Sequence, residues 1–97
     1  MKNFRLYQAA IRFYKLCSAL RLPRHLQEQL NRSSSSISLN ISEGYGRVSR
    51  GDKRRFYRIA LGSVRESRTV FELADVNDPV LCDLGDYLAA GLYKLVR

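Results

Sequence analysis

Apolar side chains recur at spacings of three and four residues along almost the whole chain, and short polar or glycine-containing segments separate the stretches that carry them. Two of these stretches begin at a proline, Pro23 and Pro79, a residue tolerated at the first helical position because its missing N–H would have no partner there. The pattern predicts helices near residues 3–21, 23–43, 50–75 and 79–96. Short connections favour antiparallel neighbours. We therefore predict an all-α fold, an antiparallel up-down-up-down four-helix bundle that forms one domain over residues 1–97.

The first predicted helix is apolar on nearly all sides. Its apolar positions are Phe4, Tyr7, Ala10, Ile11, Phe13, Tyr14, Cys17 and Leu20. Only a narrow polar stripe remains, made of Arg5, Gln8, Arg12 and Lys15. A helix this apolar in a chain of 97 residues needs more burial than its partner helices provide. The excess indicates self-association.

The second predicted helix contains a run of serines, Ser33–Ser36. Such a run usually indicates a linker. Here the apolar phase resumes on the same side after the run, at Leu26, Leu30, Ile37 and Ile41. A flexible linker would not preserve that phase, so we predict that the serines are helical and let another helix approach closely. Gly44 and Gly46 should end this helix as C-cap and turn residues.

Capping residues mark the starts of the last two helices. Ser49 is followed by Asp52 at the third helical position, a spacing typical of an N-cap. Asp78 comes directly before Pro79 and is a good N-cap for the fourth helix. That helix carries a leucine seam of Leu81, Leu84, Leu88, Leu92 and Leu95.

The third predicted helix has an apolar seam of mostly small residues. The seam consists of Phe56, Ala60, Ser63, Ser67, Val70 and Ala74, which predicts a tight crossing with a neighbour. On the opposite side we expect an outward face with Arg54, Arg58, Arg65 and Arg68, and with Leu61 exposed among them. The alternative of a DNA-binding helix-turn-helix requires a short recognition helix. This helix is too long for that role, and its seam is typical of a bundle.

Charge is distributed unevenly along the chain. The net charge is +8 and the sequence pI is about 10.0. Thirteen Lys/Arg and three acids occur up to Arg58, whereas four Lys/Arg and six acids follow it. Between residues 47 and 58, six basic residues accompany a single acid, Asp52. The bland interpretation is a cationic surface that aids solubility, but such asymmetry favours a basic face for nucleic acid, an anionic membrane or an acidic subunit.

The sequence carries no recognisable metal, redox or targeting motif. Cys17 and Cys82 lie far apart in apolar helical patterns, and we expect both to be buried, reduced thiols. No CxxC pair occurs, so we predict no metal and no cofactor. No apolar run approaches the ~20 residues of a membrane span, and charges interrupt the N-terminal segment. We predict a cytoplasmic protein.

Motifs across the second and third helices carry a family resemblance. They are Gln29–Arg32, Ser36–Ile37, Asn40–Gly44, Ser49 with Asp52, Phe56, and Ala60–Ser63 with Glu66. In order and spacing they resemble the four-helix bundle family named for proteins encoded in 23S rRNA intervening sequences. That family also includes relatives of the accessory variability determinant of diversity-generating retroelements. The resemblance covers roughly residues 26–75.

The resemblance implies a bundle that assembles into a homopentamer. In the retroelement branch, such a ring binds a reverse transcriptase and nucleic acid. Two features of this chain depart from the family pattern. The family more often has alanines at Ser33–Ser35, and its fourth helix is commonly longer.

Four polar residues of the motif, Asn40, Glu43, Ser63 and Glu66, invite a catalytic interpretation, which the residue types do not support. Gly44 and Gly62 belong to the same motif, and we expect all six residues to have structural roles. Catalysis would need a base, an acid or nucleophile, and a pocket. The only histidine, His25, stands near Pro23 at a helix start. We predict a non-enzymatic protein in which these groups form a polar clamp between helices or subunits, with Arg55 as the candidate partner of Glu66.

The basic segment at residues 47–58 is the candidate binding site. Guanidinium groups suit phosphates, and Tyr45 and Tyr57 could stack on unpaired bases. The predicted nucleic-acid-binding residues are Arg47, Arg50, Lys53, Arg54, Arg55, Arg58, Arg5, Arg12 and Lys15. The function predicted is that of an oligomeric RNA- or DNA-binding accessory protein that can partner a reverse transcriptase. The alternative is a scaffold whose basic face docks an acidic partner or pairs with acids of the fourth helix or of a neighbouring subunit, and a membrane-surface helix is a distant third.

Overall fold

The computed structural model describes residues 4–97, and every regular element in that part of the chain is an α-helix. The helices are α1 (Phe4–Ser18), α2 (Arg24–Gly46), α3 (Arg50–Leu73) and α4 (Pro79–Val96). The predicted all-α, four-helix fold is confirmed. Position 3, where we expected the first helix to begin, lies outside the described residues.

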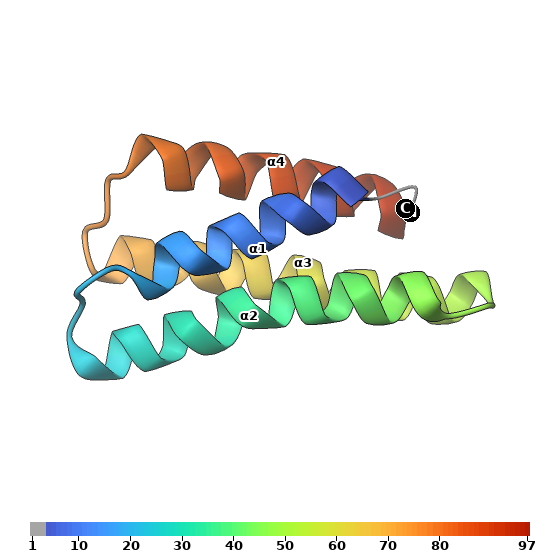
Figure 1. Cartoon of the computed structure of the whole chain (residues 1–97), viewed down its shortest axis with the longest axis horizontal. Helices are drawn as coiled ribbons and strands as arrows, with labels where there is room; N and C mark the ends of the chain where they lie inside the picture. Colours follow the sequence, from blue (N-terminus) through green and yellow to red (C-terminus); the bar gives the residue numbers. More distant parts are fainter. Residues whose placement is uncertain (1–3) are drawn as a thin grey trace.

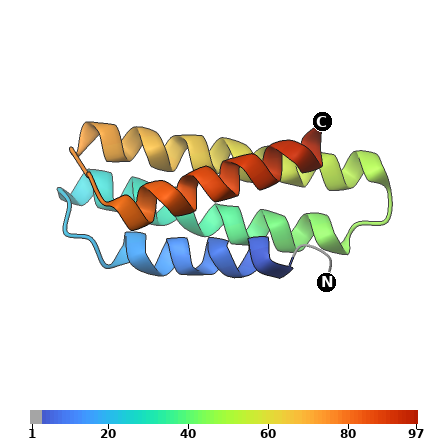
Figure 2. The same ribbon diagram turned by 90° about the horizontal axis from the view of Figure 1, so that it is seen from above.

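The helices lie side by side along the long axis of a body that measures 40 × 22 × 20 Å. The α1–α2 and α3–α4 connections lie at one end, and the α2–α3 connection lies at the other end (Figures 1 and 2). Each helix packs against its neighbours in sequence, and α1 also packs against α4. The turn between α2 and α3 extends beyond the ends of α1 and α4 (Figure 1). One end of the molecule is therefore a projecting helical hairpin.

Two predicted N-caps are confirmed, and the predicted role of one proline is wrong. The Ser49 hydroxyl accepts a hydrogen bond from the Asp52 N–H at 3.1 Å. One oxygen of Asp78 accepts from the N–H groups of Val80 and Leu81, with Pro79 in the first helical turn. Pro23 is itself the N-cap of α2, because its ψ of 142° is extended and not helical.

Two predicted helix ends also need correction. The first helix ends at Ser18, short of the predicted residue 21. Gly44 does not end α2: the helix continues to Gly46, and Arg47 is the C-cap. No glycine among the described residues has a positive φ, so neither glycine of the turn uses that freedom. Gly44 instead provides space, because a Cβ there would lie 2.6 Å from Cε1 of the Tyr57 ring.

The serine run is helical, as predicted, and it lies where α2 crosses α3. Ser33 and Ser34 are buried. The hydroxyl oxygens of Ser33 and Ser67 are 2.8 Å apart, and the Ser63 hydroxyl donates to that of Ser36 at the same distance. Short side chains let the two backbones come close, and the hydroxyls satisfy one another in the interior.

The outward face predicted for α3 is partly wrong, because this helix buries side chains against both α2 and α4. Leu61, predicted to be exposed, is only 6% exposed. Tyr57 is buried at 4%, whereas Phe56 is half-buried at the edge of the seam. Of the arginines expected to face outward, Arg58 and Arg65 are exposed and the other two, Arg54 and Arg68, are half-buried. The prediction assumed that α3 has one buried side, and so it missed the side that packs against the second neighbouring helix.

The cysteines differ from one another. Cys17 is fully buried, as predicted, and its burial, followed by the nearby charge of Asp78, raises the pKa of its thiol to about 12. Cys82 is exposed, so its predicted burial is wrong. Cys82 lies near the start of α4. Leu81 and Leu88 form the buried side of this helix, and Cys82 is not on that side. Within residues 4–97, no helix is long and apolar enough to cross a membrane.

Candidate nucleic-acid interface

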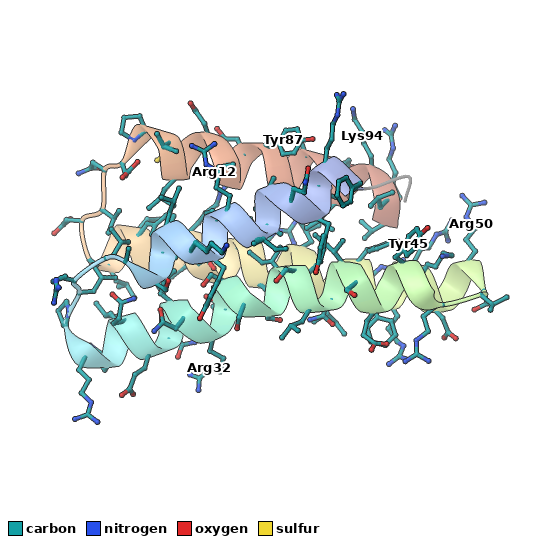
Figure 3. The ribbon with its side chains drawn as sticks, in the orientation of Figure 1. Arg12, Arg32, Tyr45, Arg50, Tyr87 and Lys94 are labelled. Carbon is teal, nitrogen blue, oxygen red and sulfur yellow. The ribbon has the colours of Figure 1, made fainter. Side chains whose placement is uncertain are left out.

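The basic segment forms the projecting end of the α2–α3 hairpin, which we call the tip and define as residues 43–58. Ser49 caps α3 at this point, so only the short segment 47–49 separates the two helices. Figure 3 shows Arg50 and Tyr45 at this end of the molecule. Val48 is 98% exposed and Tyr45 is 45% exposed. The tip therefore offers basic, aromatic and apolar side chains to solvent on one projection.

Phe56 is the centre of a cationic cluster at the tip. The guanidinium carbon of Arg47 lies 4.8 Å from the centroid of the Phe56 ring, and that of Arg55 lies 4.5 Å from it. Arg47 comes from the end of α2 and Arg55 from α3, so the cluster joins both helices. Glu43 accepts a hydrogen bond from Arg47 at 2.9 Å. Two guanidinium groups thus contact the same aromatic ring, and only one of them, that of Arg47, is paired with a carboxylate.

Lys53 has a structural role at the tip that the sequence did not suggest. Its Nζ donates to the carbonyl oxygens of Tyr45 at 3.0 Å and Gly44 at 3.4 Å. These carbonyls belong to the last turn of α2, where a positive charge is favourable; the Gly44 oxygen also accepts from the Arg47 N–H. Nζ also lies 5.6 Å from the centroid of the Tyr45 ring. Lys53 therefore ties α3 to the end of α2.

The remaining basic side chains of the tip differ in accessibility. Arg50 and Arg58 are exposed. Arg54 is half-buried, and its Nε is buried without a hydrogen-bond partner among the described residues. Tyr57, predicted to stack on bases, is buried against Gly44 and is not available for that role.

The tip keeps most of its charge. Of its basic residues, Arg47 alone forms an ion pair within the described part of the chain. The acids of α4 do not neutralise the tip, since the ion pair that joins α3 to α4 is between Arg68 and Asp86. The suggestion that the tip arginines pair with the fourth helix of the same chain is therefore wrong.

The remaining predicted nucleic-acid-binding residues lie on α1, which does not contribute to the tip. Arg5, Arg12 and Lys15 are all exposed on α1. Figure 3 shows Arg12 well away from Arg50 along the bundle. The structure thus brings residues 47–58 together on the tip, whereas Arg12 lies on another part of the bundle.

The family motif residues differ in their contacts. The Ser63 hydroxyl of α3 donates to the Ser36 hydroxyl of α2 at 2.8 Å. The Asn40 amide donates to the carbonyl and hydroxyl oxygens of Ser36 at 2.8 and 3.0 Å. Glu66 accepts a hydrogen bond from Gln29 at 2.7 Å, so the predicted pairing of Glu66 with Arg55 is wrong. A Cβ on Gly62 would meet nothing within 4 Å. The predicted polar clamp between helices therefore holds for Ser63 and Glu66 only, which bond to α2. Asn40 bonds within α2, and the exposed Glu43 pairs with Arg47.

The described residues contain no group of three or more histidine, cysteine or acidic side chains that could hold a metal ion. The side chains that the tip presents are cationic and aromatic. Guanidinium groups donate hydrogen bonds to anions, and aromatic rings offer stacking faces.

The fold and the tip define a small helical bundle protein with a basic, solvent-facing hairpin. The family model described as 23S rRNA-intervening sequence protein matches residues 2–79, and the chain belongs to that family. The match covers α1, α2 and α3 and ends at the start of α4. No curated protein and no solved structure matches the chain.

Proposed function

We propose that the protein is a non-enzymatic, oligomeric nucleic-acid-binding accessory protein that contacts RNA or DNA through the α2–α3 tip. The observation that carries this proposal is the set of basic side chains on a projecting hairpin that lack acidic partners within the described chain. Uncompensated guanidinium groups attract polyanions and form bidentate hydrogen bonds with phosphates. Phosphate contacts provide affinity without sequence readout, so we expect weak sequence preference.

Self-association into a pentamer of up-down-up-down bundles is part of the proposal. Leu61 no longer supports it, since it is buried within the protomer. Leu39 and Ile59 do support it, at 65% and 45% exposure. Leu39 is one turn from Ser36 and Ile59 one turn from Ser63, and these two serines are in contact. The two apolar side chains therefore lie at the same level of the α2–α3 pair. A ring of protomers would carry several tips and multiply the phosphate contacts.

The cellular setting belongs to the same proposal. The chain resembles the accessory variability determinants of diversity-generating retroelements, and a reverse transcriptase is the protein partner that this resemblance favours. We place this activity in the cytoplasm.

The second candidate function is a scaffold whose tip docks an acidic protein. Val48 favours it, because a valine exposed at 98% among arginines gives a protein partner an apolar contact that phosphates would not use. Binding to nucleic acid tests the two functions against each other.

The experiment is a salt series of binding curves on single-stranded and duplex RNA and DNA. Each phosphate neutralised contributes about −0.9 to the slope of log K against log salt on duplex DNA and about −0.7 on single strands. The double variant Arg50→Glu/Arg58→Glu should weaken binding and flatten the slope by about two contacts per engaged protomer. Both side chains are exposed, so helical content should be unchanged.

The matched control is Arg21→Glu/Arg65→Glu, which changes the net charge equally at exposed positions outside the tip. It should keep a slope close to that of the wild type. If both double variants lose affinity equally, binding depends on net charge and not on the tip. If the wild type binds none of the four nucleic acids at low salt, the acidic-partner scaffold replaces the proposal.

A further inference from the structure

We infer that Phe56, with Arg47 and Arg55, forms a stacking site for an unpaired nucleobase, so that the tip selects single-stranded segments over duplex. This inference rests on the proposed function and names the class of nucleic acid that the tip recognises. It was not evident from the sequence, where Phe56 belongs to the core seam and Tyr57 is the candidate for stacking.

The packing of α3 places Phe56 at the surface of the tip. Tyr57 turns inward and packs against Gly44, where even a Cβ would come within 2.6 Å of its ring. The preceding residue, Phe56, is about one hundred degrees away around the helix, at about 3.6 residues per turn, and therefore lies beside the buried side of α3. Phe56 is half-buried and so is held at its base while part of its side chain meets solvent.

The two arginines give the ring a function that core packing does not explain. Their guanidinium carbons lie 4.8 and 4.5 Å from one centroid, so two cationic groups contact the same ring. Glu43 neutralises Arg47, while Arg55 has no ion pair within residues 4–97. An anion beside Arg55 would give this guanidinium group an ionic partner. In a nucleic acid, that anion is the phosphate next to the stacked base.

Aromatic rings and guanidinium planes are the groups on which splayed-out bases stack. Phe56, Arg47 and Arg55 therefore combine stacking surface with phosphate donors in one cluster. Tyr45 is a second exposed ring at the tip, with the Lys53 ammonium 5.6 Å from its centroid. Aromatic side chains interleaved with basic ones are typical of proteins that bind single strands.

The shape of the tip suits the same ligand. The hairpin extends beyond α1 and α4, so its end is open on several sides (Figures 1 and 2). A base in a duplex is already stacked between its neighbours, and its faces are not accessible to a side chain. Bases in loops, bulges and ends are accessible. The stacking site thus favours unpaired segments of RNA or DNA.

The direct test uses the variant Phe56→Trp. The chain has no tryptophan, so this substitution introduces a single indole whose fluorescence reports on the site. Addition of a single-stranded oligoribonucleotide should quench the emission, because a stacked base contacts the indole. The same sequence in duplex should bind without comparable quenching. A single-stranded DNA of matched sequence is the third probe and shows whether the sugar matters.

The affinity test uses Phe56→Leu, which keeps an apolar side chain and removes the ring. Loss of one stacked base should lower single-strand affinity roughly five- to hundredfold and leave duplex affinity within about twofold. The control is Tyr93→Leu, which removes a ring exposed at 56% on α4, outside the tip. Thermal unfolding of each variant shows whether the fold is kept, and the Phe56→Trp titration gives the answer if Phe56→Leu does not fold.

The outcomes separate this inference from the proposed function. Quenching by single strands together with selective loss in Phe56→Leu supports the stacking site. Binding of both single strand and duplex with an unquenched indole overturns it and leaves the phosphate-binding tip in place. Absence of binding by the wild type overturns the proposed function and this inference together.

Discussion

The geometry of the tip requires a residue without a Cβ at position 44, which is Gly44. It lies inside α2, and a Cβ there would be 2.6 Å from Cε1, 3.0 Å from Cδ1 and 3.1 Å from Cζ of Tyr57. The ring cannot easily give way, because Tyr57 is only 4% exposed. The position of α3 relative to the end of α2, and with it the presentation of Phe56, follows from this contact.

We therefore expect Gly44→Ala to destabilise the protein by about 1–3 kcal/mol, the cost of overpacking a filled interior. Chemical denaturation measures the change. Gly62→Ala is the matched control, because a Cβ at Gly62 meets nothing within 4 Å. Alanine in an open helical position should raise the unfolding free energy by about 0.5–1 kcal/mol. Equal effects in the two variants would contradict the role given to the Tyr57 contact.

The burial of Cys17 leads to a prediction on how the stability of the protein depends on pH. The ordinary pKa of the Cys17 thiol is 9.0, and burial raises it to about 12 in the folded protein. The thiolate forms first in the unfolded chain, so the stabilising contribution is complete below pH 9 and is lost as the pH rises towards 12. Between these values the stability should fall by up to about 1.4 kcal/mol per pH unit.

Urea denaturation of the wild type and of Cys17→Ala between pH 8 and about 11 measures this difference, since all other groups titrate in both. The stability of the alanine variant should decline less steeply with pH, and parallel curves would refute the raised pKa of Cys17.

In the native protein at pH 8, a maleimide should label the exposed Cys82 and leave Cys17 unmodified.

At the scale of elements, the serines of α2 determine how closely this helix approaches α3. Ser33 is 2% exposed and contacts Ser67 through hydroxyl oxygens 2.8 Å apart. A larger side chain cannot fit there unless the helices separate. The serines thus let α2 and α3 contact each other through hydroxyl groups in the interior.

Ser33→Leu should lower the unfolding free energy by about 1–3 kcal/mol or more, because it overpacks the crossing and leaves the Ser67 hydroxyl with fewer partners. Ser35→Leu is the control at a half-exposed position of the same helix. It should change stability by less than about 0.5 kcal/mol. Comparable losses in both variants would mean that helix propensity, and not the crossing, sets the cost.

At the scale of the whole molecule, the proposed self-association predicts a mass above that of one 11.2 kDa chain. Light scattering coupled to gel filtration should give a mass near five chains. Leu39→Glu should lower that mass, because it places a charge on the exposed surface of α2 at the level of Ile59. Leu73→Glu is the matched control, since both leucines are 65% exposed. A wild-type protein that elutes with the mass of one chain at micromolar concentration would refute the proposal.

The sequence by itself determined the helices, the caps of α3 and α4 and the helical state of the serine run. These features depend on local chemistry: apolar spacing, an N-cap side chain within reach of the next turn, and an apolar phase that continues across Ser33–Ser36. It also located the basic segment 47–58, because charge density along a chain needs no knowledge of packing.

Only the tertiary structure decided which sides of α3 are buried and which residues meet at the tip. A helix that packs against two neighbours buries two sides, so Leu61 and Tyr57 turn inward and Phe56 turns out to Arg47 and Arg55. The pairing of Glu66 with Gln29, and the contact of Lys53 with the end of α2, join residues of different helices. Such contacts depend on the register of one helix against another, which local spacing does not specify.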